Sequence, residues 1–294
     1  MKYININDMK MSNIVLGTDG YGERISEDTA ADLIDTYLEN GGNTLDTARL
    51  YTGGISEEII GRYLKKCNKR NNLYISTKCS HPPLGNMSHH RLSPEDIEAD
   101  IDASLMALQI DTIDLIWLHR DDESLPVEPI IDTLNNMITK GKIRHFGASN
   151  WTHDRITLAN KYASENSKQG FCASQILYNL ATCNEMWDDT LVVCEGPEKN
   201  KYDESKIPVF AFCSQAKGFF EKYHTGTLNE KAIRRYKNEQ SIETYKKIIE
   251  EARKSATTIS YTALELLKNQ SKFPLLSIIG PSSVAQLKDT LNIN

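Results

Sequence analysis

Eight short apolar segments recur along this chain, and they limit the fold more than any other feature of the sequence. Each has four to eight residues, is rich in β-branched or aromatic types, and is apolar on both faces. This pattern is typical of a parallel strand covered on both sides. The segments are residues 14–17, 43–48, 73–79, 113–119, 143–150, 173–179, 207–214 and 275–280.

Helical patterns fill most of the intervals between these segments. Ser26 precedes one of them, with acidic residues in the first turn and a double glycine at the end. Ser93 precedes another, whose first residue is Pro94. Further helices are expected to begin at Ser56 and to cover residues 129–140 and 151–164. Two polar intervals, 180–206 and 215–240, are expected to be long loops.

The regular alternation of strands and helices predicts a single α/β domain over residues 1–294. Such alternation indicates a parallel sheet, either open or closed. Eight units in one chain, without a glycine-rich dinucleotide fingerprint, favour the closed (β/α)8 barrel, or TIM barrel. A content of 39% hydrophobic and 25% charged residues suits the large core that this fold requires.

Four side chains able to do chemistry lie at the predicted strand ends. Asp46, Lys78 and His119 end the second, third and fourth strands, and Tyr51 follows Asp46 by five residues. In a barrel, functional groups gather at the carboxyl ends of the strands. We therefore expect an acid, an ammonium, an imidazole and a phenol at one mouth of the barrel.

Reduction of a carbonyl group would use all four side-chain types. Hydride attack builds negative charge on the carbonyl oxygen, so a proton donor must stand beside it. Tyr51 is the candidate donor, and a buried ammonium such as Lys78 would lower the pKa of the phenol. Asp46 would pair with the lysine, and His119 would orient the carbonyl oxygen.

At these residues the chain resembles the aldo-keto reductases. The similar segments are residues 45–64 around Asp46 and Tyr51, 75–79 around Lys78, 114–120 around His119, and the G-x-S-N segment in 141–151. The resemblance implies an NAD(P)H-dependent oxidoreductase that reduces aldehydes or ketones to alcohols by direct hydride transfer. It places Tyr51 as the general acid.

The resemblance also implies where the cofactor binds. Ser149, Asn150 and Gln175 would hold the nicotinamide carboxamide, and Phe212 would stack on the ring. The remaining cofactor residues implied are Gly17, Thr18, Ser214, Gln215, Lys217, Gly218, Gly280, Ser282 and Gln286. Because residues 280–287 contain no cation, NADPH is expected to be preferred over NADH by a small margin only.

Two other functions remain as alternatives. The family that the chain resembles includes ion-channel partner subunits, so a cofactor-binding regulatory subunit with little turnover is one of them; strand one begins by residue 14, which gives no sign of a tethering extension. A metal-dependent sugar isomerase would need several carboxylate and histidine ligands at strand ends. Only Asp46 and His119 are candidates, and the pair His89-His90 is expected to be solvated, so no metal site is predicted.

The remaining features bear on location and partners. The formal charge of −6 and the absence of a basic stripe argue against nucleic acid as a partner. No apolar run suits a signal peptide or a membrane span, and none of the six cysteines forms a C-x-x-C pair, so a cytoplasmic protein with reduced thiols is expected. Trp187, in the 180–206 interval, is a candidate to line the substrate pocket.

Overall fold

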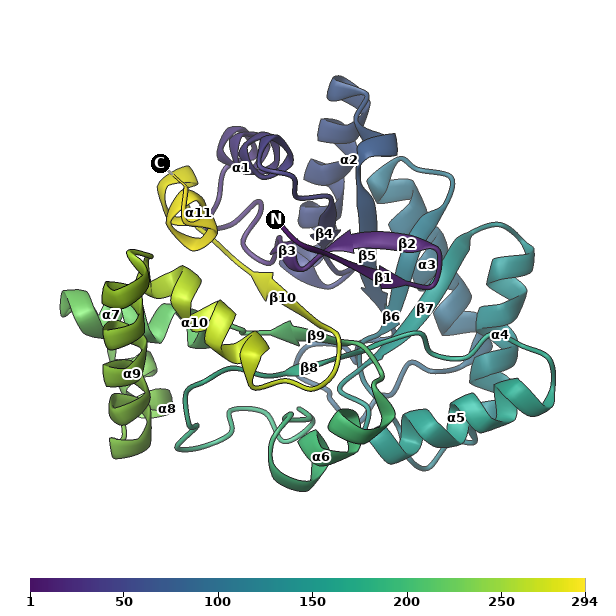
Figure 1. Ribbon diagram of the computed structural model, residues 1–294. Coiled ribbons are helices and arrows are strands. Elements are labelled where there is room, and N and C mark those ends of the chain that lie inside the picture. Colours follow the sequence, from purple (N-terminus) through teal and green to yellow (C-terminus); the bar gives the residue numbers. More distant parts are fainter. Residues whose placement is uncertain (294) are drawn as a thin grey trace.

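The computed structural model describes residues 1–293, in which eight parallel strands close into a barrel (Figure 1). The order of the strands around the barrel is β10-β3-β4-β5-β6-β7-β8-β9. Their bounds are β3 Ile14–Gly17, β4 Thr44–Asp46, β5 Tyr74–Cys79, β6 Ile113–Leu118, β7 Ile143–Ser149, β8 Ser174–Leu177, β9 Val209–Phe212 and β10 Leu275–Ile279. Each of the eight apolar segments contains one of these strands, and the predicted TIM barrel is confirmed.

Helices follow the strands and cover the outside of the barrel. They are α1 Glu27–Glu39, α2 Ile55–Cys67, α3 Pro94–Leu108, α4 Val127–Thr139, α5 His153–Glu165, α6 Gly196–Ser205, α10 Ile259–Asn269 and α11 Val284–Leu291. The expected caps are present, because Ser26 accepts a hydrogen bond from the Thr29 N–H and Ser93 accepts one from the Asp96 N–H. The side chains of α1 to α5 that face the strands form the largest apolar cluster.

The two intervals expected to be loops contain helices, so that prediction was wrong. The first holds α6, and the second holds α7 Phe219–Thr225, α8 Glu230–Tyr236 and the start of α9 Glu239–Ser255. These helices escape sequence analysis because their apolar faces are narrow: α6 buries only Tyr202, and α7 and α8 each bury two side chains. Two 3-10 turns also lie at the mouth, η1 Tyr51–Gly54 and η3 Ala216–Gly218, and a third, η2 Arg70–Asn72, lies before β5.

An antiparallel hairpin of β1 Tyr3–Ile6 and β2 Met9–Ser12 precedes the barrel and was not expected. Its Met9 and Met11 side chains are fully buried in one cluster with Trp117, which lies inside the barrel. Asp8 pairs with Arg144 at the beginning of β7. The hairpin therefore closes the amino end of the barrel, and the carboxyl end remains for the site.

Candidate active site

A cavity of about 960 Å³ opens at the carboxyl ends of the strands and is lined by all four residues of the expected catalytic set. Asp46 is the last residue of β4 and Lys78 lies in β5. His119 follows β6, and Tyr51 begins the 3-10 turn η1. The parallel strands bring these side chains together from three separate stretches of sequence.

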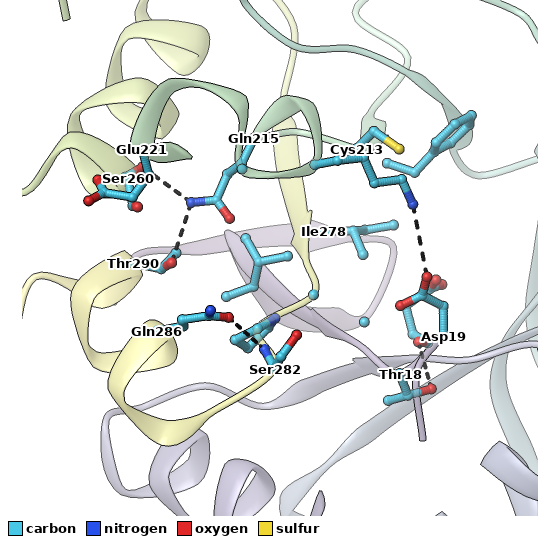
Figure 2. A pocket seen from close by; sticks show the side chains of 18 of the residues that line it. Thr18, Asp19, Cys213, Gln215, Glu221, Ser260, Ile278, Ser282, Gln286 and Thr290 are labelled. Carbon is cyan, nitrogen blue, oxygen red and sulfur yellow. Dashed lines mark hydrogen bonds and ion pairs between the residues drawn. The ribbon is translucent and has the colours of Figure 1, made fainter. Parts of the chain in front are cut away.

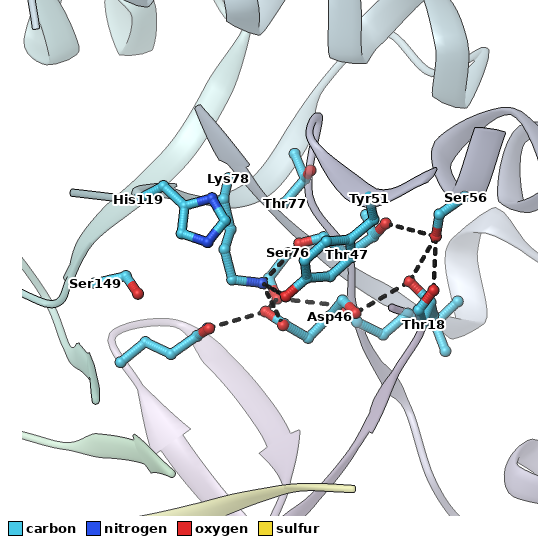
Figure 3. Close-up of polar contacts among 12 residues, drawn as sticks. Thr18, Asp46, Thr47, Tyr51, Ser56, Ser76, Thr77, Lys78, His119 and Ser149 are labelled. Atoms are coloured by element: carbon cyan, nitrogen blue, oxygen red, sulfur yellow. Dashed lines mark hydrogen bonds and ion pairs between the residues drawn. The ribbon is translucent and has the colours of Figure 1, made fainter. Parts of the chain in front are cut away.

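The ammonium of Lys78 is the centre of the polar network (Figure 3). Its Nζ donates to Asp46 Oδ2 at 2.5 Å, to the Thr47 carbonyl at 2.8 Å and to the Tyr51 hydroxyl at 3.1 Å. An ammonium has three N–H donors, so all three are used in this arrangement. The lysine is therefore fixed in one position, with the phenol oxygen beside it.

Asp46 is held by two further donors. The Ser76 hydroxyl donates to Asp46 Oδ1 at 2.8 Å, and the Gln175 side-chain amide donates to the same oxygen at 3.0 Å. Both carboxylate oxygens are thus satisfied, as a buried charge requires. Gln175 lines the cavity where the nicotinamide is expected, and it also helps to position Asp46.

The phenol and the ammonium keep their protons. Burial raises the pKa of Tyr51, and the neighbouring Lys78 offsets only part of that rise. Burial lowers the pKa of Lys78, but the negative charge of Asp46 and the hydrogen bonds to Asp46 and Tyr51 outweigh it and leave that pKa above its ordinary value. The sequence predicted that Lys78 would lower the pKa of Tyr51. In the structure the pKa is raised instead, because the loss of hydration destabilises the buried phenolate more than the charge of Lys78 stabilises it.

His119 is a neutral imidazole. Burial, reinforced by the positive charges of Lys78 and Arg120, holds its pKa well below the ordinary value. Its Nδ1 atom is buried and has no partner among residues 1–293. The ring meets Tyr51 edge-on with the centroids 6.3 Å apart, and meets His81 edge-on at 4.6 Å. Sequence analysis missed His81, because its loop carries no periodic signal.

The side chains expected at the nicotinamide end line the same part of the cavity. Ser149, Asn150, Gln175 and Phe212 all face it. Asn150 has a φ of 57°, the left-handed region that asparagine tolerates, and its amide donates to the His119 carbonyl at 3.3 Å. This bond joins the end of β7 to the end of β6.

Most of the remaining expected cofactor residues line the far end of the cavity (Figure 2). Those found there are Gly17, Thr18, Gln215, Lys217, Gly218, Gly280, Ser282 and Gln286. The Ser282 N–H donates to Gln286 Oε1 at 2.8 Å, and Lys217 Nζ lies 3.9 Å from Asp19 Oδ2. Ser214 is placed elsewhere: its buried hydroxyl donates to the Ile278 carbonyl at 2.7 Å, and it is not among the residues that line the cavity.

The cavity also contains residues that sequence analysis did not assign. Among them are Asp19, Arg24 and Arg235. Trp187, which the sequence suggested, lines the cavity as well. Asp19 and Arg24 come from the loop after β3, and Arg235 comes from α8, a helix that sequence analysis did not expect.

Metal ligands, membrane spans and thiols can be described for residues 1–293. No group of three or more His, Cys, Asp or Glu side chains in that range is placed to hold a metal ion. None of its helices combines the length and apolar character that a membrane crossing requires. All six cysteines are free.

The chain matches the Aldo/keto reductase family over residues 13–294. It belongs to this family. The catalytic geometry described above comes from the same stretch of sequence.

Individual relatives agree with the family match. An aldo-keto reductase of Alternaria alternata is 27% identical and aligns over 99% of this chain and 86% of its own length. An aryl-alcohol dehydrogenase of Pestalotiopsis microspora is 32% identical over 54% of this chain, and norsolorinic acid reductase B of Dothistroma septosporum is 28% identical over 59%. The matches span only 43% and 47% of the length of these last two proteins.

A solved structure supports the fold. The crystal structure of an aldo-keto reductase from Klebsiella pneumoniae in complex with NADPH superposes with a TM-score of 0.73. It covers 99% of this chain and 88% of the Klebsiella chain, at 18% sequence identity. The barrel and the order of its elements are therefore shared.

Proposed function

We propose that the protein is an NAD(P)H-dependent reductase of aldehydes or ketones. The observation that carries this proposal is the position of Lys78 Nζ, 2.5 Å from Asp46 Oδ2 and 3.1 Å from the Tyr51 hydroxyl, in a cavity large enough for a ligand. A buried cation beside a protonated phenol is suited to give a proton to an oxygen that gains negative charge.

In this function the protein positions the carbonyl group and supplies one proton. Bound NAD(P)H supplies the hydride. As the carbonyl carbon accepts it, the Tyr51 O–H transfers its proton to the carbonyl oxygen, and Lys78 stabilises the phenolate that remains until solvent reprotonates it. His119 is neutral and donates a hydrogen bond to the same oxygen, which fixes the direction of the carbonyl group.

The cavity residues suit a dinucleotide. Ser149 and Asn150 offer hydroxyl and amide groups for a carboxamide, and the ring of Phe212 offers a face for stacking. At the other end, the beginning of α11 and Lys217 favour an anion such as a phosphate. We assign a preference for NADPH, with NADH accepted as well.

Three features of the sequence interpretation stay predictions. They are the cytoplasmic location, the absence of a nucleic-acid partner, and the roles of the individual cofactor residues. The complete set of Asp46, Tyr51, Lys78 and His119 favours an enzyme over a regulatory subunit, because a cofactor-binding subunit has no need of a proton donor.

Mixing the purified protein with NADPH or NADH and a panel of aldehydes and ketones tests the proposal. The absorbance of the reduced cofactor should fall in the presence of a carbonyl substrate. Binding of the cofactor without turnover on any member of a broad panel would instead support the regulatory subunit.

A further inference from the structure

One wall of the cavity is built from two segments far apart in sequence, residues 180–191 and α8. The Asn184 N–H donates to the Arg235 carbonyl at 2.8 Å, and its side-chain amide donates to the Arg234 carbonyl at 2.8 Å. Asn238, just after α8, donates to the Thr182 carbonyl at 2.8 Å. These bonds fix α8 against the loop that carries Trp187.

Arg235 lies on this wall with its guanidinium over the indole of Trp187. The Cζ atom is 4.1 Å from the ring centroid, a close cation–π contact. Both side chains line the cavity. Trp187 is itself supported by an edge contact with Tyr236, with the centroids 6.4 Å apart. The guanidinium is therefore held on a rigid aromatic surface.

Within residues 1–293, the Arg235 side chain forms no ion pair and no hydrogen bond, and its Nε is buried without a partner. Several other cationic side chains of the cavity are paired. Arg24 and Lys217 both approach Asp19, and Arg120 pairs with Asp188 at 3.1 Å. Arg235 is therefore a cation of the cavity wall without an anionic partner among residues 1–293, and its terminal N–H groups are available to a ligand acceptor.

The wall lies on the substrate side of the cavity. Asp188, next to Trp187, is bonded to Arg120, and Arg120 follows His119 at the end of β6. In the closed barrel β6 stands four strands away from β10 in either direction, whereas the expected phosphate end of the cofactor lies at β10 and α11. The loop that carries Trp187 is thus anchored beside His119, at the strand opposite β10 in the barrel.

We propose that Arg235, seated on Trp187, binds a carboxylate carried by the carbonyl substrate. The substrate class is then an aldehyde or ketone with an acid group, and this inference rests on the proposed reductase function. A guanidinium stacked on a ring keeps its N–H edge free and gives a carboxylate two parallel, charge-assisted hydrogen bonds. Leu191 and Phe220, which also line the cavity, provide apolar contacts for the part between carboxylate and carbonyl.

Two matched aldehydes test the proposal: 4-carboxybenzaldehyde and its neutral analogue, methyl 4-formylbenzoate. With NADPH, the wild type should show a kcat/KM about 10- to 100-fold higher for the acid, the usual range for hydrogen bonds to a charged group. In Arg235→Gln, kcat/KM for the acid should fall to about that for the ester, and kcat/KM for the ester should change by less than about threefold. Equal use of both aldehydes by the wild type would overturn the inference.

Arg234→Gln is the matched control. Arg234 is the neighbouring residue, is exposed, pairs with Glu185 and does not line the cavity, so its loss should leave both aldehydes unaffected. Arg235→Lys keeps the charge but not the two parallel donors, and should fall between the wild type and Arg235→Gln. The Kd of NADPH should be the same in all four proteins. A weaker NADPH Kd in Arg235→Gln would assign the arginine to the cofactor and reject the proposal.

A binding measurement separates this inference from the reductase function. The carboxylate 4-methylbenzoate has no carbonyl to be reduced, and its affinity is measured by calorimetry in the presence of NADPH. The wild type should bind it at least about 10-fold more tightly than Arg235→Gln. If no aldehyde is reduced, the reductase function fails, and this comparison still decides the role of Arg235: equal affinities reject it.

Discussion

Lys78 and Asp46 form a buried ion pair, with Nζ and Oδ2 2.5 Å apart and each side chain 2% exposed. Two charges so far from water are stable only with good geometry and full hydrogen bonding. The Lys78 ammonium donates its two other hydrogen bonds to Thr47 and Tyr51, and the Asp46 carboxylate accepts hydrogen bonds from Ser76 and Gln175. The pair thereby holds a cation permanently beside the phenol.

Replacement of Lys78 by methionine should abolish turnover and destabilise the fold by about 3–5 kcal/mol, because the Asp46 carboxylate is left buried and unpaired. Adding Asp46→Asn should recover part of the stability but none of the activity. The amide introduced by this second change would keep an oxygen to accept from Ser76 and Gln175. Urea unfolding of the wild type, the single variant and the double variant measures these differences.

Lys142→Met provides the control for this experiment. Lys142 pairs with Asp102 on the surface, where such pairs contribute about 0–1 kcal/mol. Its loss should leave stability within that range. A double variant at Asp46 and Lys78 no more stable than Lys78→Met alone would contradict the view that the two charges stabilise one another.

Tyr51→Phe should lower the rate of carbonyl reduction by about 10²- to 10⁴-fold, the range for a lost general acid. The Kd of NADPH should change little, because the phenol is assigned to the substrate oxygen. Stopped-flow or steady-state rates with fluorescence titration of the cofactor measure both quantities. Turnover close to that of the wild type would show that the proton comes from another group.

Neutral His119 should make the fold sensitive to acid. Its pKa is well below 6.5 in the folded protein, so below about pH 6.5 the unfolded chain binds a proton that the folded chain refuses. Stability therefore falls as the pH falls, by up to about 1.4 kcal/mol per pH unit. His119→Gln should lose less stability than the wild type between pH 8 and pH 5.

The exposed His89 supplies the comparison. His89→Gln should keep the acid sensitivity of the wild type, because the His89 side chain is exposed and lies outside the cavity. Identical pH profiles for the wild type and His119→Gln would mean that His119 accepts a proton without disturbing the fold.

The strands, and the polar side chains that gather at their carboxyl ends, were predictable because each leaves a local signature. A buried parallel strand such as β6 is apolar throughout, and the rule that functional groups gather at strand ends then selects Asp46, Lys78 and His119. The β1–β2 hairpin was missed because polar residues interrupt both strands and side chains such as Met9 are buried against distant parts of the chain.

Features that depend on contacts between distant segments could not be predicted. The stacking of Arg235 on Trp187 joins two residues far apart in sequence through a loop and a short helix that carry no periodic pattern. The direction of the Tyr51 pKa shift depends on how fully the phenol is buried, and sequence gives the neighbouring charge without the burial. Residue types are local, whereas burial and pairing are properties of the folded chain.

The preference for NADPH should be modest, and the start of α11 gives the reason. Ser283 is the N-cap of this helix, and residues 280–287 supply no cation to meet a 2′-phosphate. The hydroxyl of Ser282 makes no hydrogen bond to residues 1–293, so it is available to an anion together with backbone N–H groups of the first turn. We expect NADPH to bind more tightly than NADH by about 1–3 kcal/mol, the contribution of a few hydrogen bonds to a charged group.

Ser282→Arg should widen that margin, because a guanidinium gives a phosphate two charge-assisted hydrogen bonds where the hydroxyl gives one. Ser282 is exposed, so the longer side chain has room. Asn269→Arg, at the end of α10 and away from the cavity, adds the same charge and should leave the margin unchanged. Dissociation constants of both cofactors, from quenching of tryptophan fluorescence, measure the effect. If NADH binds the wild type as tightly as NADPH does, the beginning of α11 does not bind a 2′-phosphate and the assigned preference for NADPH is wrong.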